Sequence, residues 1–154
     1  MDYKEWLSLL GLPANDRYVA AALRAHGIES TVTLEPQELS TGLDFKDAGL
    51  SLGFTSEFSL RGGEARLPIL SSVVLMLRLG KRASGWTVYG GALPHGLSNT
   101  SSKDEVVALL GAPTNLNDTF CSALWVIDGK ELRILFTDEW KQIKQLGLSL
   151  PRAT

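Results

Sequence analysis

The sequence predicts an α+β fold in which an antiparallel meander sheet carries about three helices packed on one face. Three short segments, at residues 3–10, 17–26 and after Ser102, place apolar residues at the 3.6-residue period of a helix. The other apolar segments alternate with polar residues, which is typical of antiparallel strands with one solvated face. Tight turns such as Asp128-Gly129 join neighbouring strands, so consecutive strands are expected to pair.

Length and composition favour one globular domain spanning residues 1–154. The chain is 44% hydrophobic and 21% charged, which suits a packed core and argues against disorder. The net charge is -2 and no basic stripe occurs, so nucleic acid is not an expected partner. The longest apolar run, 73–77, is too short to span a bilayer, and the first residues lack a signal-peptide pattern. We therefore expect a cytoplasmic protein with no membrane partner.

One phrase occurs twice, at residues 5–15 and 105–115. Six of the eleven aligned positions are identical, including a Leu-Leu-Gly sequence and the proline that follows it. In each copy a helix is expected to end at the glycine, Gly11 or Gly111, because glycine adopts the left-handed conformation of a helix C-terminus. Two interpretations stay open. The phrase reflects either a pseudo-repeat, 1–99 and 100–150, or the same local way of ending a helix.

In the first part of the chain, helix 3–10 is expected to bury Trp6, and Asp16 is a good N-cap for helix 17–26. Alternation predicts strands at 30–34, 43–46 and 50–54, the last two forming a hairpin. Further strands are expected at 67–79, which is apolar on both faces and therefore central, and at 86–89. The polar residues 55–66 predict a surface loop.

In the second part, Ser102 and Glu105 have the spacing of a capping box at the start of the third helix. Strands are predicted at 123–127, 131–136 and 142–148. The polar turn before the last strand contains Trp140. Two roles stay open for this tryptophan: an anchor at a protein interface, or a member of a satellite hydrophobic cluster under the turn.

No motif for catalysis, metal binding or cofactor binding is present. The chain lacks a P-loop, a dinucleotide-binding glycine pattern, CxxC, HExxH and G-x-S-x-G. Cys121 is expected to be a buried, inert thiol, and His26 and His95 to have structural roles. The carboxylates fall in turns, where they are expected to be solvated. We therefore predict no catalytic residue, no metal site, no cofactor and no enzymatic activity.

Several phrases together resemble small bacterial immunity proteins, which are encoded beside polymorphic toxins of contact-dependent or type VI secretion systems. These phrases are spread over nearly the whole chain: Leu10-Gly11-Leu12-Pro13, Gly42-Leu43-Asp44-Phe45, Leu93-Pro94-His95-Gly96-Leu97, Lys103-Asp104-Glu105-Val106, Leu110-Gly111-Ala112-Pro113, and Trp125 with Leu132-Arg133-Ile134. The resemblance implies a protein that binds a cognate toxin in the cytoplasm and occludes its active site. Trp140 departs from the pattern, which more often has a small residue or glycine there.

The helix followed by Leu-Gly-x-Pro also resembles the repeat of β-lactamase-inhibitor-like folds and of outer-membrane assembly lipoproteins. Those proteins are not enzymes, and this chain lacks the lipobox of the lipoproteins. Two alternatives to an immunity protein therefore stay open: a chaperone or adaptor for a secreted effector, and a non-enzymatic inhibitor-like binding domain.

If the resemblance holds, the contacts with the toxin are expected at exposed loop and strand positions. Charged residues at such positions can accelerate association with a partner of opposite charge. The expected partner-binding residues are Asp44, Asp47, Glu57, Phe58, Arg61, Glu64, Asp138, Glu139 and Trp140.

Overall fold

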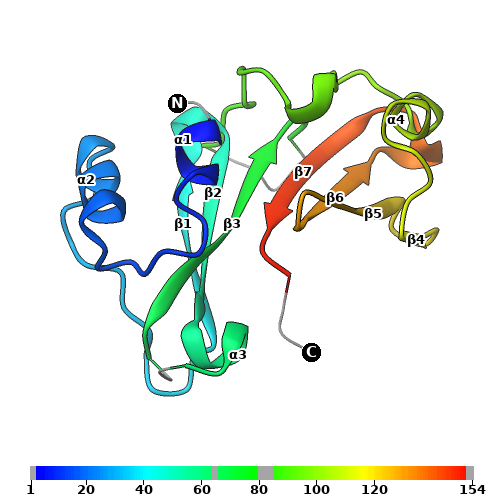
Figure 1. Ribbon diagram of the computed structural model, residues 1–154. Coiled ribbons are helices and arrows are strands. Elements are labelled where there is room, and N and C mark those ends of the chain that lie inside the picture. The colour runs from blue at the N-terminus through cyan, green and yellow to red at the C-terminus, as the bar shows by residue number, and fades with distance from the viewer. Residues whose placement is uncertain (1–2, 64–65, 80–84, 152–154) are drawn as a thin grey trace.

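The computed structural model describes residues 3–63, 66–79 and 85–151 and contains one antiparallel sheet (Figure 1). The predicted α+β class and the meander are confirmed. The strands are β1 (Ser40–Phe45), β2 (Leu50–Ser56), β3 (Pro68–Met76), β4 (Asn115–Asn117), β5 (Ser122–Ile127), β6 (Lys130–Phe136) and β7 (Ile143–Ser149).

The strand order β1-β2-β3-β7-β6-β5-β4 joins two meanders through their last strands. β3 and β7 pair from Ser72 opposite Ser149 to Met76 opposite Gln145. The phrase at residues 5–15 precedes the first meander, and the phrase at 105–115 precedes the second. The central pair of strands is therefore the contact that makes one sheet of the two parts.

The described residues form four α-helices rather than about three: α1 (Tyr3–Leu7), α2 (Arg17–Ala25), α3 (Glu57–Arg61) and α4 (Lys103–Leu110). The predicted caps are present. The Asp16 side chain accepts hydrogen bonds at the start of α2, and Ser102 and Glu105 form the capping box of α4. The helix α3 occupies part of the segment predicted to be a loop. Ser56 caps its start and Gly62, with φ +81°, ends it.

One face of the sheet carries the core. Trp6 of α1, Val19 of α2 and Val106 of α4 are fully buried in the same cluster as Leu52 of β2 and Ile134 of β6. Figure 1 shows α1 and α2 near the β1–β3 half, and α4 near the β5–β6 half. The helix α3 differs, because its buried residue, Leu60, does not belong to this cluster.

Two predicted strands are absent. Val32 and Leu34 are both buried, as the alternation at 30–34 predicts, but this segment forms no strand. The segment 86–89 is also irregular, although the Tyr89 N–H donates to the Met76 carbonyl at 2.8 Å. At 30–34 the alternation matches the burial pattern, although the segment joins no ladder. At 86–89 the expected inward residues Trp86 and Val88 are half-buried and exposed, and Tyr89 is buried instead. The short edge strand β4 was not predicted.

The two copies of the repeated phrase leave their helices differently. Gly11 and Gly111 both have a positive φ, +93° and +88°. The helix α4 ends directly before Gly111, as predicted, but α1 ends at Leu7, and turns instead of helix cover residues 8–10. The Gly11 N–H then donates to the Leu70 carbonyl of β3 at 2.8 Å. In the second copy the Gly111 carbonyl accepts instead from the Trp125 indole N–H of β5 at 2.9 Å. The shared feature is thus a glycine with positive φ after the Leu-Leu pair, while the end of the helix and the path after the glycine differ.

Candidate functional site

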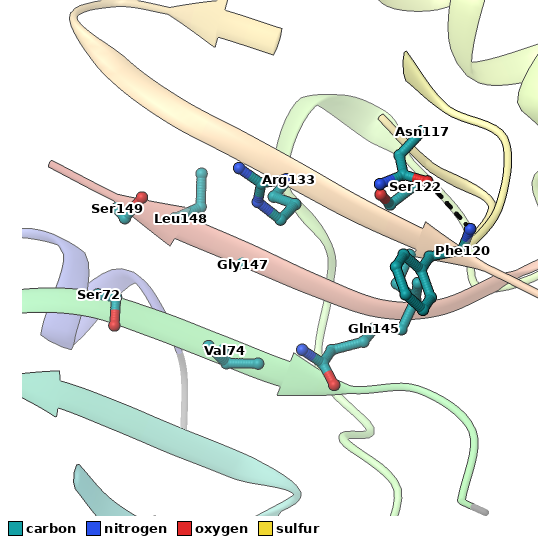
Figure 2. Close-up of a pocket in the computed structure, with 11 residues that line it drawn as sticks. Ser72, Val74, Asn117, Phe120, Ser122, Arg133, Gln145, Gly147, Leu148 and Ser149 are labelled. Carbon is teal, nitrogen blue, oxygen red and sulfur yellow. Dashed lines mark hydrogen bonds between the residues drawn. The ribbon is translucent and has the colours of Figure 1, made fainter. Parts of the chain in front are cut away.

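The face of the sheet opposite the core carries an open hollow of about 560 Å³ (Figure 2). Residues in register across three strands form its middle: Val74 of β3 lies opposite Gly147 of β7, which lies opposite Arg133 of β6. The lining comes from strands β3 to β7 and from the β4–β5 turn, and none of the described helices contributes to it.

Two further hollows adjoin the first and extend it along the strands. A hollow of about 510 Å³ shares Arg133 with it and reaches Leu60 of α3. A hollow of about 550 Å³ shares Phe120 and reaches Asp138 in the β6–β7 turn. We call the three together the trough. It runs from α3 to the β6–β7 turn.

The hollow exists because small residues occupy the centre of this face. Ser72 and Ser149 lie opposite each other, and Gly147 follows at the next position on this face. A Cβ at Gly147 would lie 3.7 Å from the Val74 Cγ2 atom, which is an ordinary contact, so nothing in the backbone requires glycine there. A larger residue would therefore fill the hollow and leave the sheet intact.

The trough is lined by three cationic side chains that form no ion pair with any residue the structure describes. Arg133 is exposed, and neither Arg133 nor Lys144 makes a side-chain hydrogen bond or ion pair with a described residue. Arg78 donates one long hydrogen bond of 3.4 Å from Nη2 to the Asn99 carbonyl, while its buried Nε lacks a partner among the described residues. These cations stand out in a chain whose net charge is -2.

Two carboxylates also line the trough, one near each end. Glu131 faces the hollow beside α3, and Asp138 faces the hollow at the β6–β7 turn. Between them, Arg133 is the charged residue of the central hollow. The middle of the trough is therefore cationic, and Arg78 and Lys144 outnumber Asp138 in the hollow at the β6–β7 turn.

Phe120 is an exposed aromatic residue at one end of the central hollow, close to Gln145 (Figure 2). Its side chain is 68% exposed, the largest value among the exposed large hydrophobic residues described. The turn holds it in place, because the Phe120 N–H donates to the Asn117 side-chain oxygen at 3.2 Å. An exposed aromatic ring on an ordered turn is typical of an interface anchor.

Three of the expected partner-binding residues lie in α3. Glu57 and Arg61 form an ion pair of 3.1 Å, and Arg61 also donates to the Gly11 carbonyl at 3.3 Å. These two side chains thus have partners inside the protein. Phe58 is 61% exposed and remains available for contact. The expected residue Glu64 lies outside the described residues.

Three others lie at the β6–β7 turn. Asp138 faces the trough. Glu139 pairs at 3.1 Å with Lys141 on the surface. Trp140 is half-buried: its ring lies 5.5 Å from that of Phe136, and the Lys103 Nζ atom of α4 lies 4.7 Å from the ring centroid. For Trp140, the structure therefore favours packing against the core over an exposed anchor.

The last two expected residues lie on the first hairpin. Asp44 is on the open face of β1, where its carboxylate accepts a hydrogen bond of 2.8 Å from the Ser51 hydroxyl. Asp47 is exposed in the short 3₁₀ turn Lys46–Ala48. The described members of the expected set are thus distributed among α3, the β6–β7 turn and this hairpin, and do not form one compact patch.

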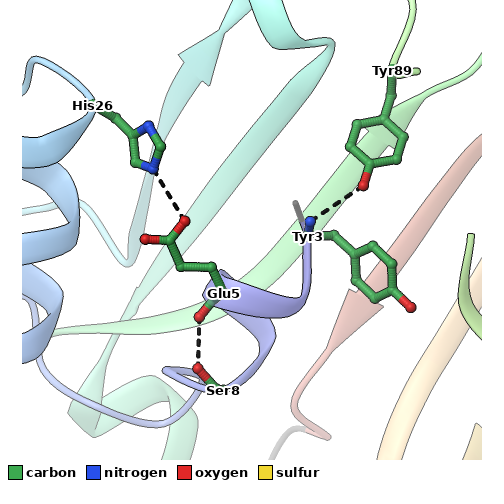
Figure 3. A network of polar contacts seen from close by, with 5 residues as sticks. All are labelled: Tyr3, Glu5, Ser8, His26 and Tyr89. Atoms are coloured by element: carbon green, nitrogen blue, oxygen red, sulfur yellow. Dashed lines mark hydrogen bonds and ion pairs between the residues drawn. The ribbon is translucent and has the colours of Figure 1, made fainter. Parts of the chain in front are cut away.

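The two histidines and the cysteine do not form a catalytic arrangement among the described residues. His26 lies 3.2 Å from the Glu5 carboxylate and links α2 to α1 (Figure 3). Its ring also packs against Trp6, with centroids 5.3 Å apart. His95 is exposed on a short turn far along the chain. The sequence predicts a buried thiol at Cys121, but this residue is half-buried, because it lies in the exposed β4–β5 turn.

Within the described residues, no group of three or more His, Cys, Asp or Glu side chains is placed to hold a metal ion. No described helix is long and apolar enough to cross a membrane. The feature that distinguishes the described surface is therefore the trough, which the expectations from the sequence included only through Asp138.

The residues that sequence reasoning missed are Arg133, Gly147, Arg78 and Phe120. The alternation of apolar and polar residues indicates the solvated faces of β6 and β7, because Arg133 and Gly147 each lie between buried neighbours. What the sequence does not supply is the register that places them side by side.

No protein-family model matches the chain, and no curated protein or solved structure matches it significantly.

Proposed function

We propose that this chain is a protein-binding module that neutralises a cognate toxin in the cytoplasm, and that it binds the toxin with the open face of its sheet. One observation supports this proposal most directly: a continuous trough on a sheet face where, among the described helices, only α3 contributes a lining residue, at one end. The identification of the partner as a toxin rests on the resemblance of the sequence phrases to immunity proteins.

The character of the trough favours a protein partner. Exposed Phe120 offers an aromatic anchor at its wall, and the serines, Gln145 and Arg133 offer hydrogen-bonding groups over the same surface. Interfaces between proteins combine aromatic residues and arginine with a polar surround in this way. Occlusion of the toxin by a rigid sheet face needs no chemistry from this chain.

The proposal is tested by co-expression with the toxin domain encoded beside this gene. The wild-type protein is expected to restore growth and to co-purify with the toxin. Gly147→Leu is expected to abolish both, because the leucine side chain fills the central hollow while its Cβ makes only an ordinary contact with Val74.

Gly90→Leu is the matched control, since Gly90 is exposed and a Cβ there meets no atom within 4 Å. This variant is expected to protect cells as the wild type does. Equal protection by Gly147→Leu and wild type would exclude the open face as the binding surface. If wild-type protein binds the effector but leaves the mature toxin active, the chaperone or adaptor function replaces the immunity function.

A further inference from the structure

We propose that the trough binds an acidic, extended segment of the partner, with carboxylates of that segment placed on Arg133 and on the Arg78 and Lys144 pair. This inference rests on the proposed function for the existence of a protein partner, and it adds the chemistry by which that partner is recognised. The argument has three steps: the charges, their unsatisfied state, and the shape of the surface.

The first step is the sign of the charges. The central hollow contains Arg133 as its charged residue, the hollow at the β6–β7 turn contains Arg78 and Lys144 with Asp138, and the hollow beside α3 contains Glu131 with Arg133. Three cations thus line the described trough against two carboxylates, and both carboxylates lie towards its ends. The chain as a whole is acidic, with a net charge of -2. A cationic region on an acidic protein selects an anionic partner, because the remaining surface repels the approach of that partner in other orientations.

The second step is that the described residues of the protein do not satisfy these cations. Their ion pairs involve other cations, such as Arg61 with Glu57 and Lys141 with Glu139. Arg133 and Lys144 have no polar side-chain partner among the described residues, and Arg78 has one bond at 3.4 Å. A guanidinium group presents several donors in a plane and matches a carboxylate with two parallel hydrogen bonds.

The third step is the shape. Arg133 lies beside Gly147, so the hollow leaves space over the guanidinium for an incoming side chain. Hydroxyl groups of Ser72 and Ser149 lie on the same face at neighbouring positions and can donate to a carboxylate. The trough continues past Phe120 towards Arg78 and Lys144, so an extended segment can reach both cationic positions.

The test uses the full-length protein and short synthetic peptides, so it does not depend on a toxin. A peptide of alternating glutamate and glycine is titrated into isotopically labelled protein, and amide shifts are followed by NMR. Shifts are expected at Ser72, Val74, Arg133 and Gly147. A peptide with glutamine in place of glutamate, and one with lysine, are expected to leave these amides unchanged.

Arg133→Glu is expected to weaken binding of the glutamate peptide about tenfold or more, because an attractive charge becomes repulsive. Arg24→Glu makes the same charge change on the exposed surface of α2, outside the trough, and is expected to alter affinity less than about twofold at physiological salt. The amide spectrum of each variant verifies that it is folded.

Three results would overturn the inference: equal weakening by Arg24→Glu and Arg133→Glu, equal binding of the glutamine peptide, or shifts confined to another surface. Shifts of the trough amides on dilution of the protein alone would assign the trough to a second copy of this chain and would also overturn it. If the protein fails to restore growth but an acidic peptide still binds in the trough, the proposed neutralisation of a toxin is refuted and this inference stands.

Discussion

Glu139 and Trp140 both adopt positive φ, +61° and +58°, in the β6–β7 turn. A side chain in this region costs about 1–2 kcal/mol for a residue other than glycine. Glu139→Gly is therefore expected to raise the free energy of unfolding by about 0.5–1 kcal/mol, since part of the gain is offset by the greater freedom of glycine in the unfolded chain. Urea unfolding followed by tryptophan fluorescence measures the change.

Glu139→Ala provides the control for this prediction. It removes the surface pair with Lys141 but keeps a Cβ in the left-handed region, so it is expected to leave stability nearly unchanged. An equal gain from alanine and glycine would show that the turn is not strained. The sequence indicates the left-handed turn at Asp128-Gly129, because those residue types favour it. Glutamate followed by tryptophan does not, so this turn could not be predicted.

At the scale of elements, the β1–β2 hairpin is held against the segment 87–89. Gly49 has φ +67°, and a Cβ there would collide with the backbone of Thr87 and Tyr89. Gly49→Ala is expected to destabilise the protein by about 3 kcal/mol or more, because backbone atoms have to move in addition to the cost of the positive φ. Thermal unfolding and urea unfolding measure the loss.

Gly27→Ala is the matched comparison, because Gly27 has φ +88° but a Cβ there meets no atom within 4 Å. It is expected to cost only about 1–2 kcal/mol, from the positive φ alone. Equal losses from the two substitutions would mean that the close approach of segment 87–89 contributes nothing to stability.

The helix α4 depends on its capping box. Ser102 accepts a hydrogen bond from the Glu105 N–H at 3.3 Å, and the Glu105 carboxylate accepts from the Ser102 N–H at 3.2 Å. Ser102→Ala is expected to lower the free energy of unfolding by about 1 kcal/mol. Ser102→Asp keeps a capping oxygen and is expected to recover most of that loss, as measured by urea unfolding. An alanine variant as stable as wild type would refute a role for the cap.

The elements that could be predicted are those whose signals are local. Caps at Asp16 and Ser102 and the strands β5, β6 and β7 follow from residue type and alternation. The helix α3 was missed because five residues are too few to show a helical period. Segment 86–89 alternates like a strand, but whether an alternating segment joins a ladder depends on partners far away in the chain.

At the scale of the whole molecule, the two meanders are expected to unfold as one unit. Leu146 of β7 is fully buried and lies opposite both Leu75 of β3 and Ile134 of β6. Leu146→Ala is expected to cost about 2–5 kcal/mol through the lost side chain and the cavity. Native-state hydrogen exchange of the wild type is expected to give equal opening free energies in β2 and β5. Leu146→Ala is expected to lower both by the same amount.

A loss confined to one meander would show two separate folding units instead of the single domain that the sequence predicts.

The candidate site also depends on the arrangement of the whole molecule. The solvated faces of β3, β6 and β7 follow from alternation, but the trough depends on the pairing of β3 with β7 across a long stretch of chain. Sequence reasoning consequently pointed to exposed turns, where polar residues are conspicuous, and missed the centre of the sheet.

The central position of β3 has a consequence during synthesis. One edge of β3 pairs with β2 almost as soon as it is made, but the other edge waits for β7, which follows only after α4 and three further strands. Ribosomes add roughly 5–20 residues per second, so that edge stays open for several seconds in every new chain. An apolar strand with one open edge is a template for pairing between chains. Crowding of nascent chains on one messenger is therefore expected to lower the yield of native protein, and a chaperone that covers β3 to raise it.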